Sequence, residues 1–152
     1  MVQMIETPEE KERIAEKILA ALPEWFGLPD SRAEYVRESR GQMFWADVES
    51  GEARGFLTLK ATSPHTAELY VMGVLPPHHR QGIGRALFGA FYRYAKSHGY
   101  AFLQVKTVRE GCYAAYDRTI AFYRSLGFRE LECFPSLWDP WNPCQILVMA
   151  VR

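Results

Sequence analysis

The stretch from Ala67 to Leu75 constrains the fold more than any other part of the sequence, because it is largely apolar on both faces of an extended chain. Side chains alternate between the two faces of a strand. A strand that is apolar on both faces is expected to be covered on both. Pro76-Pro77 then ends it, so the sequence predicts a central strand with a layer of structure on each side. One face carries Glu68, Tyr70, Met72 and Val74, and the other carries Leu69, Val71, Gly73 and Leu75.

A helix and another strand follow this central strand. Apolar residues recur at helical spacing after Gly84, and Gly99 is placed to end that helix near His98. Residues 100–107 are expected to form the next strand, and a strand–helix–strand succession joins parallel strands by a crossover. The fold class is therefore expected to be α/β with a mixed sheet. The remaining expected elements are a helix capped by Thr7 and ending at Leu22, a helix over 31–39 with a capping box at Ser31, strands over 43–48 and 55–61, a helix over 117–126 closed by Gly127, and strands over 128–134 and 145–151.

The composition favours a single folded domain and excludes several classes of partner. The chain has 152 residues, and its 18 basic and 18 acidic residues balance, so a strongly basic nucleic-acid-binding protein is not expected. The longest apolar run, over 146–151, is far below the roughly 20 residues that span a bilayer, and the acidic N-terminus does not resemble a signal peptide. Three widely spaced cysteines provide neither a disulfide framework nor a zinc site. We therefore expect a cytoplasmic protein without a metal, with neither nucleic acid nor membrane as its partner.

The charges are distributed unevenly along the chain. Residues 1–52 carry 12 acidic and 6 basic side chains, whereas residues 53–152 carry 6 acidic and 12 basic ones. Chance placement of solvated charges explains this asymmetry. A C-terminal part that binds a polyanion, with an N-terminal part that faces a cation, explains it equally well. The sequence alone leaves both explanations open.

The turn from His79 to Arg85, with the sequence HRQGIGR, leads from the buried strand into a helix N-terminus. Main-chain N–H groups in the first turn of a helix lack internal partners, and the helix dipole favours an anion there. Gly82 and Gly84 keep side chains away from the backbone, and Arg80 and Arg85 add positive charge. The turn is therefore suited to hold a diphosphate.

Two known nucleotide-binding fingerprints do not fit this turn. A Rossmann turn requires a third glycine where this chain has Leu87, and a P-loop requires Lys-Ser or Lys-Thr where this chain has Arg85-Ala86. A tight strand-to-helix turn that holds no ligand is the alternative interpretation of the two glycines taken alone.

Two motifs together resemble the GNAT superfamily of N-acetyltransferases. The sequence LYVMGVLPPHHRQGIGRAL, over 69–87, is similar to motif A, a strand followed by Q/R-x-x-G-x-G/A and a helix, with His79 at the Arg/Gln position. The sequence TIAFYRSLGF, over 119–128, resembles the A-x-x-F-Y-x-x-x-G-F motif. The resemblance runs from about Met43 onward. It implies one GNAT-like domain over 1–152, a mixed, mostly antiparallel sheet with helices on both faces, whose first strand would fall on Val2–Ile5 and be very short or absent.

The resemblance implies acetyl-CoA as the co-substrate and a primary amine as the acceptor, hence an acyltransferase in which the amine attacks directly in a ternary complex. Residues 43–152 would form the acetyl-CoA-binding core, and the helical segment 1–40 would lie near the acceptor site. In the family, the backbone of the motif A strand bonds the pantetheine arm and the turn holds the diphosphate. The residues implied by this match are Val74, Arg80, Gln81, Gly82, Ile83, Gly84 and Arg85, together with Tyr116, where many members have an asparagine near the pantetheine arm.

Acyl transfer from a thioester to an amine needs a base, a donor for the carbonyl oxygen and an acid for the leaving thiolate. By the resemblance, the backbone N–H of Met72 is that donor and Tyr123 is the acid. Glu68, eleven residues before His79, matches the catalytic glutamate of histone-acetylating members. It lies about 13 Å along the strand from Met72, so a base role would require a bridging water. The structural alternatives are packing of Tyr123 on the sheet and a solvated carboxylate at Glu68.

The acceptor site is the least determined part of the prediction. Family acceptor sites use the N-terminal helices and the loops near the last strands. Aromatic rings beside carboxylates suit an organic cation, whereas core packing is the alternative for the tryptophans. A small amine, an amino acid and a protein or peptide amine are all left open, and so is a homodimer. The aromatic residues implied for this site are Trp25, Phe26, Tyr35, Trp45 and Trp138.

Two other functions share parts of this pattern with the transferase. A CoA-binding or sensor module of the same fold would keep the glycine turn and lose the acid and the base. A glyoxalase-like metal protein also contains F-Y-x-x-x-L-G-F, but it needs further His or Glu ligands, and no histidine follows Phe128. Because Tyr123 and Glu68 are both present, we expect the enzyme.

Overall fold

The computed structural model describes residues 1–152, which form four α-helices and seven strands. The strands are hydrogen-bonded in the order β1-β2-β3-β4-β5-β7-β6. Strands β4 and β5 are parallel, whereas β1–β2, β2–β3, β5–β7 and β6–β7 are antiparallel. The expected α/β class with a mixed, mostly antiparallel sheet is confirmed. The elements are β1 (Val2–Met4), α1 (Pro8–Ala20), α2 (Pro29–Ser39), β2 (Met43–Glu49), β3 (Glu52–Ser63), β4 (Thr66–Val74), α3 (Ile83–Ser97), β5 (Phe102–Val108), α4 (Ala114–Leu126), β6 (Arg129–Asp139) and β7 (Asn142–Ala150).

The chain forms two compact units. The first comprises Met1–Lys60 and Leu69–Tyr94, and the second comprises Ala61–Glu68 and Ala95–Arg152. The first unit therefore contains the turn between β4 and α3, and the second contains α4 and the hairpin of β6 and β7. No helix of the chain is both long and apolar enough to cross a membrane.

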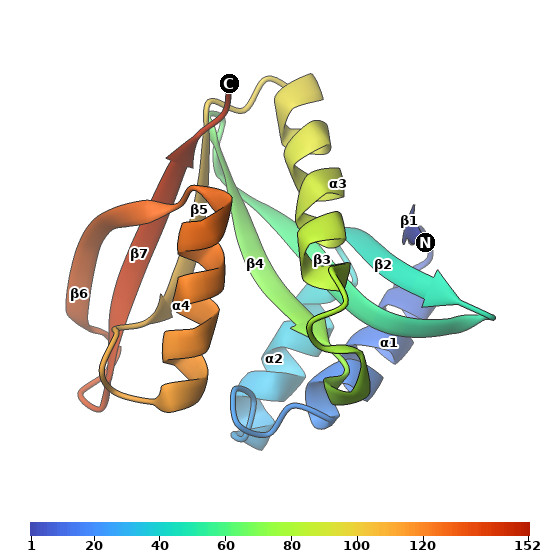
Figure 1. Ribbon diagram of the computed structural model, residues 1–152, viewed down its shortest axis with the longest axis horizontal. Coiled ribbons are helices and arrows are strands. Elements are labelled where there is room, and N and C mark those ends of the chain that lie inside the picture. Colours follow the sequence, from blue (N-terminus) through green and yellow to red (C-terminus); the bar gives the residue numbers. More distant parts are fainter. The chain divides into compact units, whose positions relative to one another are not determined.

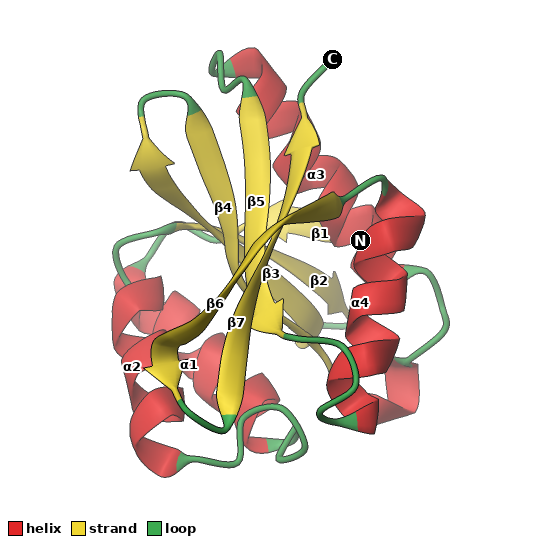
Figure 2. Cartoon of the chain, turned by 90° about the vertical axis from the view of Figure 1, so that its left-hand side faces the viewer, coloured by secondary structure: helices red, strands yellow, loops and turns green.

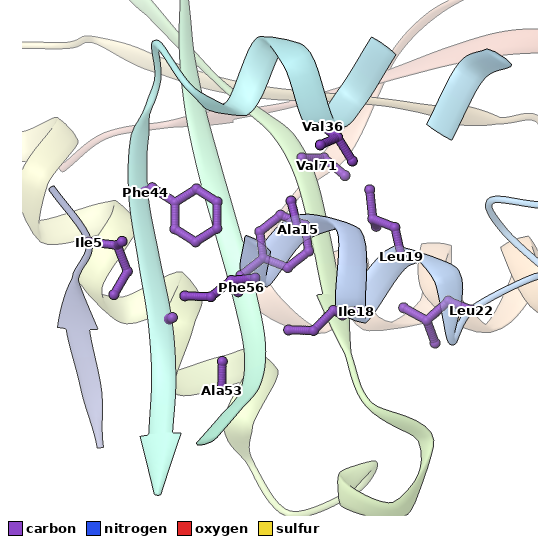
Figure 3. Packing of buried hydrophobic residues seen from close by; sticks show 12 residues of the cluster. Ile5, Ala15, Ile18, Leu19, Leu22, Val36, Phe44, Ala53, Phe56 and Val71 are labelled. Atoms are coloured by element: carbon purple, nitrogen blue, oxygen red, sulfur yellow. The ribbon is translucent and has the colours of Figure 1, made fainter. Parts of the chain in front are cut away.

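Helix α1 begins where the sequence predicts, because Thr7 caps it. Thr7 Oγ1 accepts a hydrogen bond from the Glu10 N–H at 3.3 Å. The apolar stripe of α1 is buried against β2 and β3, where the rings of Phe44 and Phe56 stack with centroids 5.1 Å apart (Figure 3). Tertiary packing of such a stripe contributes more to the stability of a short helix than its intrinsic propensity.

The opposite face of β2 and β3 carries α3 (Figure 1). The Trp45 ring lies 6.3 Å from that of Phe91 and 5.4 Å from that of Tyr94, both on α3. Gly55 on β3 leaves room for the start of α3, since a Cβ there would lie 3.1 Å from Ile83 Cγ2. Within the first unit, α1 and α2 therefore cover one face of the sheet and α3 covers the other.

In the second unit, β5, β7 and β6 form a sheet beside α4 (Figure 2). Strand β5 is paired with β7 along its whole length, from Phe102 opposite Ala150 to Val108 opposite Cys144. Helix α4 ends at Gly127, whose φ of 113° lies in the left-handed region that favours glycine. This C-cap agrees with the sequence prediction.

Helix α2 begins earlier than the sequence predicts. Its first residue is Pro29, with Leu28 as an N-cap that makes no side-chain hydrogen bond, so Ser31 lies inside the helix rather than at its cap. Proline at the first helical position has a φ that already suits the helix and lacks an N–H that would need a partner. That preference outweighs the capping box expected at Ser31.

The last third of the chain also differs from the sequence prediction. Helix α4 begins at Ala114 instead of Asp117, and the Asp117 carboxylate accepts a hydrogen bond from the Gly111 N–H in the preceding loop at 2.9 Å. Strand β6 continues to Asp139 because that residue closes the hairpin, where its carboxylate accepts a hydrogen bond from the Trp141 N–H at 2.9 Å. The first strand, β1, is three residues long, as short as the sequence suggested.

We predict that Gly73→Ala destabilises the protein and that Gly41→Ala does not. A Cβ at Gly73 would lie 2.8 Å from Leu22 Cδ1 and 3.0 Å from Ile18 Cγ2, whereas nothing lies within 4 Å of a Cβ at Gly41. Overpacking of this kind costs about 1–3 kcal/mol. Urea unfolding followed by circular dichroism measures both variants, and equal losses in the two would contradict the packing argument.

Candidate functional site

The turn between β4 and α3 is the segment that the sequence predicts to bind an anion. Arg80 and Gly82 have φ of 63° and 81°, and the Ala86 N–H makes a helical hydrogen bond back to the Gly82 carbonyl at 3.0 Å. The N–H groups that precede Ala86 in the first helical turn lie before the first helical hydrogen bond, at the positive end of the α3 dipole. Arg80, Gln81, Gly82 and Arg85 are exposed, Gly84 is half-buried and Ile83 is buried. The predicted diphosphate turn therefore presents its backbone to solvent.

Hydrogen bonds within the turn hold it in this shape. The His78 N–H bonds to the Leu75 carbonyl at 2.9 Å, and the His79 N–H bonds to the Pro76 carbonyl at 3.2 Å. The His79 ring nitrogen Nε2 lies 2.6 Å from the Val74 carbonyl oxygen. These contacts tie the turn to the end of β4.

The turn has open space at Gly82 and a strained backbone conformation at Arg80. No atom lies within 4 Å of a Cβ built on Gly82, so the volume that a side chain would fill is available to a ligand. Arg80 adopts a left-handed conformation that costs a non-glycine residue about 1–2 kcal/mol. Strained residues of this kind cluster at ligand-binding sites. Open space and a strained backbone therefore occur together at this turn.

The strand that enters the turn is anchored to its neighbour. Met72 and Val74 are half-buried on β4, and the Leu75 N–H bonds to the Arg54 carbonyl at 2.8 Å just beyond the strand. His79 contacts the Val74 carbonyl, whose oxygen still has a second lone pair for a ligand.

In the second unit, Tyr116 and Tyr123 lie on the same side of α4, because seven residues make two helical turns. Tyr123 is buried, with 7% exposed, and its ring packs edge-on against Phe128 with centroids 5.9 Å apart. Tyr116 is half-buried beside Tyr113, with ring centroids 5.9 Å apart. The predicted acid thus has a fixed orientation and a largely desolvated ring.

The Glu68 carboxylate is buried. It is therefore not the solvated carboxylate that the sequence analysis named as the alternative to a base. Its side chain is 3% exposed, and its Oε1 accepts a hydrogen bond from Gln104 Nε2 at 3.0 Å and lies 3.3 Å from Lys106 Nζ. A buried carboxylate needs such partners, because an unpaired charge is strongly disfavoured away from water. Glu68 is therefore held in place by two side chains of β5.

The aromatic residues that were predicted for the acceptor site belong to both units. The rings of Phe26 and Tyr35 lie 5.6 Å apart in the first unit, and both residues are half-buried. Trp45, with 4% exposed, belongs instead to the core beneath α3, which leaves its ring almost no surface for a ligand. Trp138 is 42% exposed near the end of β6, in the second unit.

Trp25 contacts the turn between β4 and α3. Its ring meets that of His79 edge-on, with centroids 6.4 Å apart. No local pattern indicated this contact or the pairing between Glu68 and Lys106, because both join segments far apart in the chain. The sequence analysis placed Tyr70 on the same strand face as Met72, two positions before it, but did not assign it to the site.

The candidate residues described above offer backbone N–H groups, tyrosine hydroxyls and one carboxylate, that of Glu68. No group of three or more histidine, cysteine or acidic side chains could hold a metal ion. The three cysteines are free thiols. Burial raises the pKa of the Cys144 thiol to about 11, which keeps it protonated at neutral pH.

Residues 10–128 match the family model described as the acetyltransferase (GNAT) family. This match covers most of the chain and includes both the turn and α4. The chain belongs to the GNAT family of acetyltransferases. The resemblance predicted from the two motifs is thereby confirmed.

Solved structures share the fold of this GNAT chain at low sequence identity. A protein described as a GNAT-family acetyltransferase from Desulfovibrio desulfuricans matches with a TM-score of 0.83 and 19% identity over 100% of both chains. An aminoglycoside 6'-N-acetyltransferase complexed with coenzyme A matches with a TM-score of 0.78 and 18% identity, over 100% of this chain and 97% of that chain. The ribosomal-protein-S18-alanine N-acetyltransferase from Escherichia coli matches with a TM-score of 0.75 and 21% identity, over 99% and 94%. No curated protein sequence matches the chain.

We predict that Lys106→Met destabilises the protein, because it leaves the buried Glu68 carboxylate without its cation. Lys106 is one-third exposed, so we expect a loss of about 1–3 kcal/mol, below the full cost of an unpaired buried charge. The double variant Glu68→Gln/Lys106→Met removes the charge as well and should recover part of the loss. Urea unfolding measures all three proteins.

The matched control is Lys17→Met, which breaks the exposed pair of Lys17 with Glu52. Exposed ion pairs contribute little to stability, so this variant should unfold close to the wild-type urea concentration. If both lysine variants lose the same stability, the burial of Glu68 is not what makes its pairing important.

Proposed function

We propose that this GNAT chain transfers an acetyl group from acetyl-CoA to a primary amine, by direct attack of the amine in a ternary complex. The observation that carries the proposal is the turn at Arg80–Arg85, whose strained, internally bonded backbone leaves open space at Gly82 in front of a helix N-terminus. Membership of the acetyltransferase family supports the reaction class. The shared fold of a neighbour described as complexed with coenzyme A supports the choice of donor.

In this proposal the diphosphate of the donor lies on the turn. The backbone N–H groups from Gln81 to Arg85 bind its oxygens, and the Arg80 and Arg85 guanidinium groups add positive charge. The backbone of Val74 bonds the pantetheine arm, and Tyr116 lies beside that arm. The donor supplies an activated acyl group, and every other task falls to side chains and amides of this chain. Residues 43–152 form the donor-binding core, and residues 1–40 lie on the acceptor side.

Tyr123 is proposed as the general acid. The amine nitrogen bonds to the acyl carbon, the carbon–sulfur bond breaks, and the phenol of Tyr123 gives its proton to the departing thiolate. Because a phenol is a weaker acid than a thiol, Tyr123 contributes mainly through its fixed position. The Met72 N–H is proposed to donate to the carbonyl oxygen as negative charge develops there.

Glu68 is proposed to accept the proton of the amine through a water molecule. Lys106 and Gln104 both contact its Oε1, so Oε2 is the oxygen through which a relay would act. The distance of about 13 Å along the strand to Met72 makes direct contact with the attacking nitrogen unfavourable. A purely structural role in pairing with Lys106 is the alternative.

We predict that Gly82→Val removes acetyl-CoA binding and that Gly51→Val does not. Both glycines have φ near 80°, and a Cβ at either position would have no atom within 4 Å, so the two substitutions carry similar backbone strain. Only the side chain at Gly82 would fill the proposed diphosphate space. Isothermal titration with CoA measures the difference, and normal binding by Gly82→Val would place the diphosphate elsewhere.

We predict that Tyr123→Phe lowers kcat by tenfold or more with little change in the affinity for acetyl-CoA, because general acids contribute about 10²–10⁴-fold. Tyr113→Phe, an exposed tyrosine just before α4, is the control. Release of the CoA thiol is measured over a panel that includes an aminoglycoside and an alanine-terminated peptide. The exposed thiol of Cys112 is first replaced by serine so that it does not react with the thiol reagent.

The same panel separates the transferase from a CoA-binding sensor module. Binding of acetyl-CoA without turnover for every amine would favour the sensor. An unchanged kcat in Tyr123→Phe would leave the transferase in place and remove Tyr123 from its mechanism.

A further inference from the structure

Three aromatic rings from separate segments of the first unit meet edge-on at the surface. Phe26 lies in the loop between α1 and α2, Tyr35 on α2 and Tyr70 on β4. The Tyr35 ring lies 5.6 Å from that of Phe26 and 5.3 Å from that of Tyr70. All three residues are half-buried and pack on the core beneath α1 and α2. We call these three residues the aromatic surface.

One ring of the aromatic surface already holds a cation. The Lys60 ammonium lies over the Tyr70 ring, 5.2 Å from its centroid. Contacts of this kind are worth about 0.5–1 kcal/mol when exposed. Lys60 itself is an exposed residue of β3, so its ammonium can leave the ring for water at little cost. The ring is therefore a cation-binding face whose present occupant can be displaced.

The position of the aromatic surface relates it to the proposed reaction. Tyr70 and Met72 lie on the same face of β4, about 7 Å apart along the strand. Residues 24–39, which contain Phe26 and Tyr35, carry four acidic and two basic side chains. A cation that approaches this surface therefore meets both π-electron density and a negative local charge.

We propose that the aromatic surface binds a second cationic group of the acceptor, an ammonium or a guanidinium, while the neutral amine of the same molecule attacks the acyl carbon near Met72. The acceptor is then a molecule with two basic nitrogens, and Lys60 competes with it for the Tyr70 ring. The acceptor part of this inference rests on the proposed function. The cation site itself does not, because it follows from ring and charge geometry alone.

Tetramethylammonium, titrated against the full chain, tests the cation site without any catalysis. Binding is followed by the NMR signals of the tyrosine rings, with tert-butanol as an uncharged probe of similar shape. We expect Lys60→Met to bind tetramethylammonium about two- to fivefold more tightly than wild type, because the competing ammonium is gone. We expect Tyr70→Phe to keep the binding and Tyr70→Leu to lose it.

Lys96→Met is the matched control, since Lys96 is exposed on α3 and its loss changes the net charge equally. Weaker or unchanged binding by Lys60→Met would overturn the proposal, and so would binding by Tyr70→Leu equal to that of wild type. Equal responses to tetramethylammonium and tert-butanol would overturn it too, because they would show that charge is not recognised. Tyr70→Phe and Lys60→Met preserve the packing, so these outcomes can be interpreted even if Tyr70→Leu fails to fold.

Acetyl transfer to linear diamines and to monoamines of equal length tests the acceptor part. We expect kcat/KM to favour the diamine in wild type, through a lower KM, and Lys60→Met to increase that preference. A preference for monoamines would overturn the acceptor part. If no amine of either kind is acetylated, the proposed function fails, while the tetramethylammonium titration still decides whether the cation site exists.

Discussion

The close approach of α1 to β4 at Gly73 is the contact on which the rest of the first unit depends. The absence of a side chain there lets Leu22 and Ile18 reach the strand, and Gly55 gives the same freedom to α3 on the other face. Helices can therefore pack closely on both faces of the sheet near the end of β4, where the turn begins. The hydrogen bond between the His79 ring and the Val74 carbonyl oxygen connects the turn to this packed strand end. A backbone anion site needs such support, because its amides must already point in the right direction when the ligand arrives.

The uneven charge of the chain affects which ligands are attracted to it more than it affects the free energy of unfolding. Within the acidic first segment, Glu10 pairs with Arg13 and Glu12 pairs with Arg40. Exposed pairs of this kind add little to the free energy of unfolding. They also leave the net charge of the segment unchanged, so its attraction for cations persists. That attraction agrees with an acceptor that carries positive charge, and the basic remainder of the chain agrees with a polyanionic donor.

The family and the fold leave the acceptor open. The solved structures that match this chain include an aminoglycoside acetyltransferase and a ribosomal-protein acetyltransferase at 18% and 21% identity. One scaffold thus serves a sugar-like amine and a protein amine, because specificity resides in side chains placed on the fold rather than in the fold itself. For this chain we propose that those side chains are the aromatic residues that α2, the preceding loop and β4 contribute.

Much of the fold could be predicted from local sequence, since strand alternation, helix caps and glycine turns depend on residues close together in the chain. Thr7 capped its helix as expected, and Gly127 ended α4 as expected. The predicted helix starts were wrong at two places. Pro29 prevailed over Ser31 at the start of α2, and α4 began at Ala114 instead of Asp117, whose carboxylate bonded to a loop amide. Sequence could not rank such signals, because their energies differ by less than the tertiary contacts that decide between them.

The sequence by itself determined the strand, the glycine turn and the helix that follows it, since the three are consecutive in the chain and need only backbone preferences and hydrophobic pattern. Only the tertiary structure decided the surroundings of individual side chains. It buried Trp45 beneath α3, paired Glu68 with Lys106, and brought Lys60 over the ring of Tyr70. Each of these contacts depends on how strands pair and on which face of the sheet a helix covers. The hydrophobic pattern shows which face of a strand or helix is buried, but it does not show which other element packs against that face.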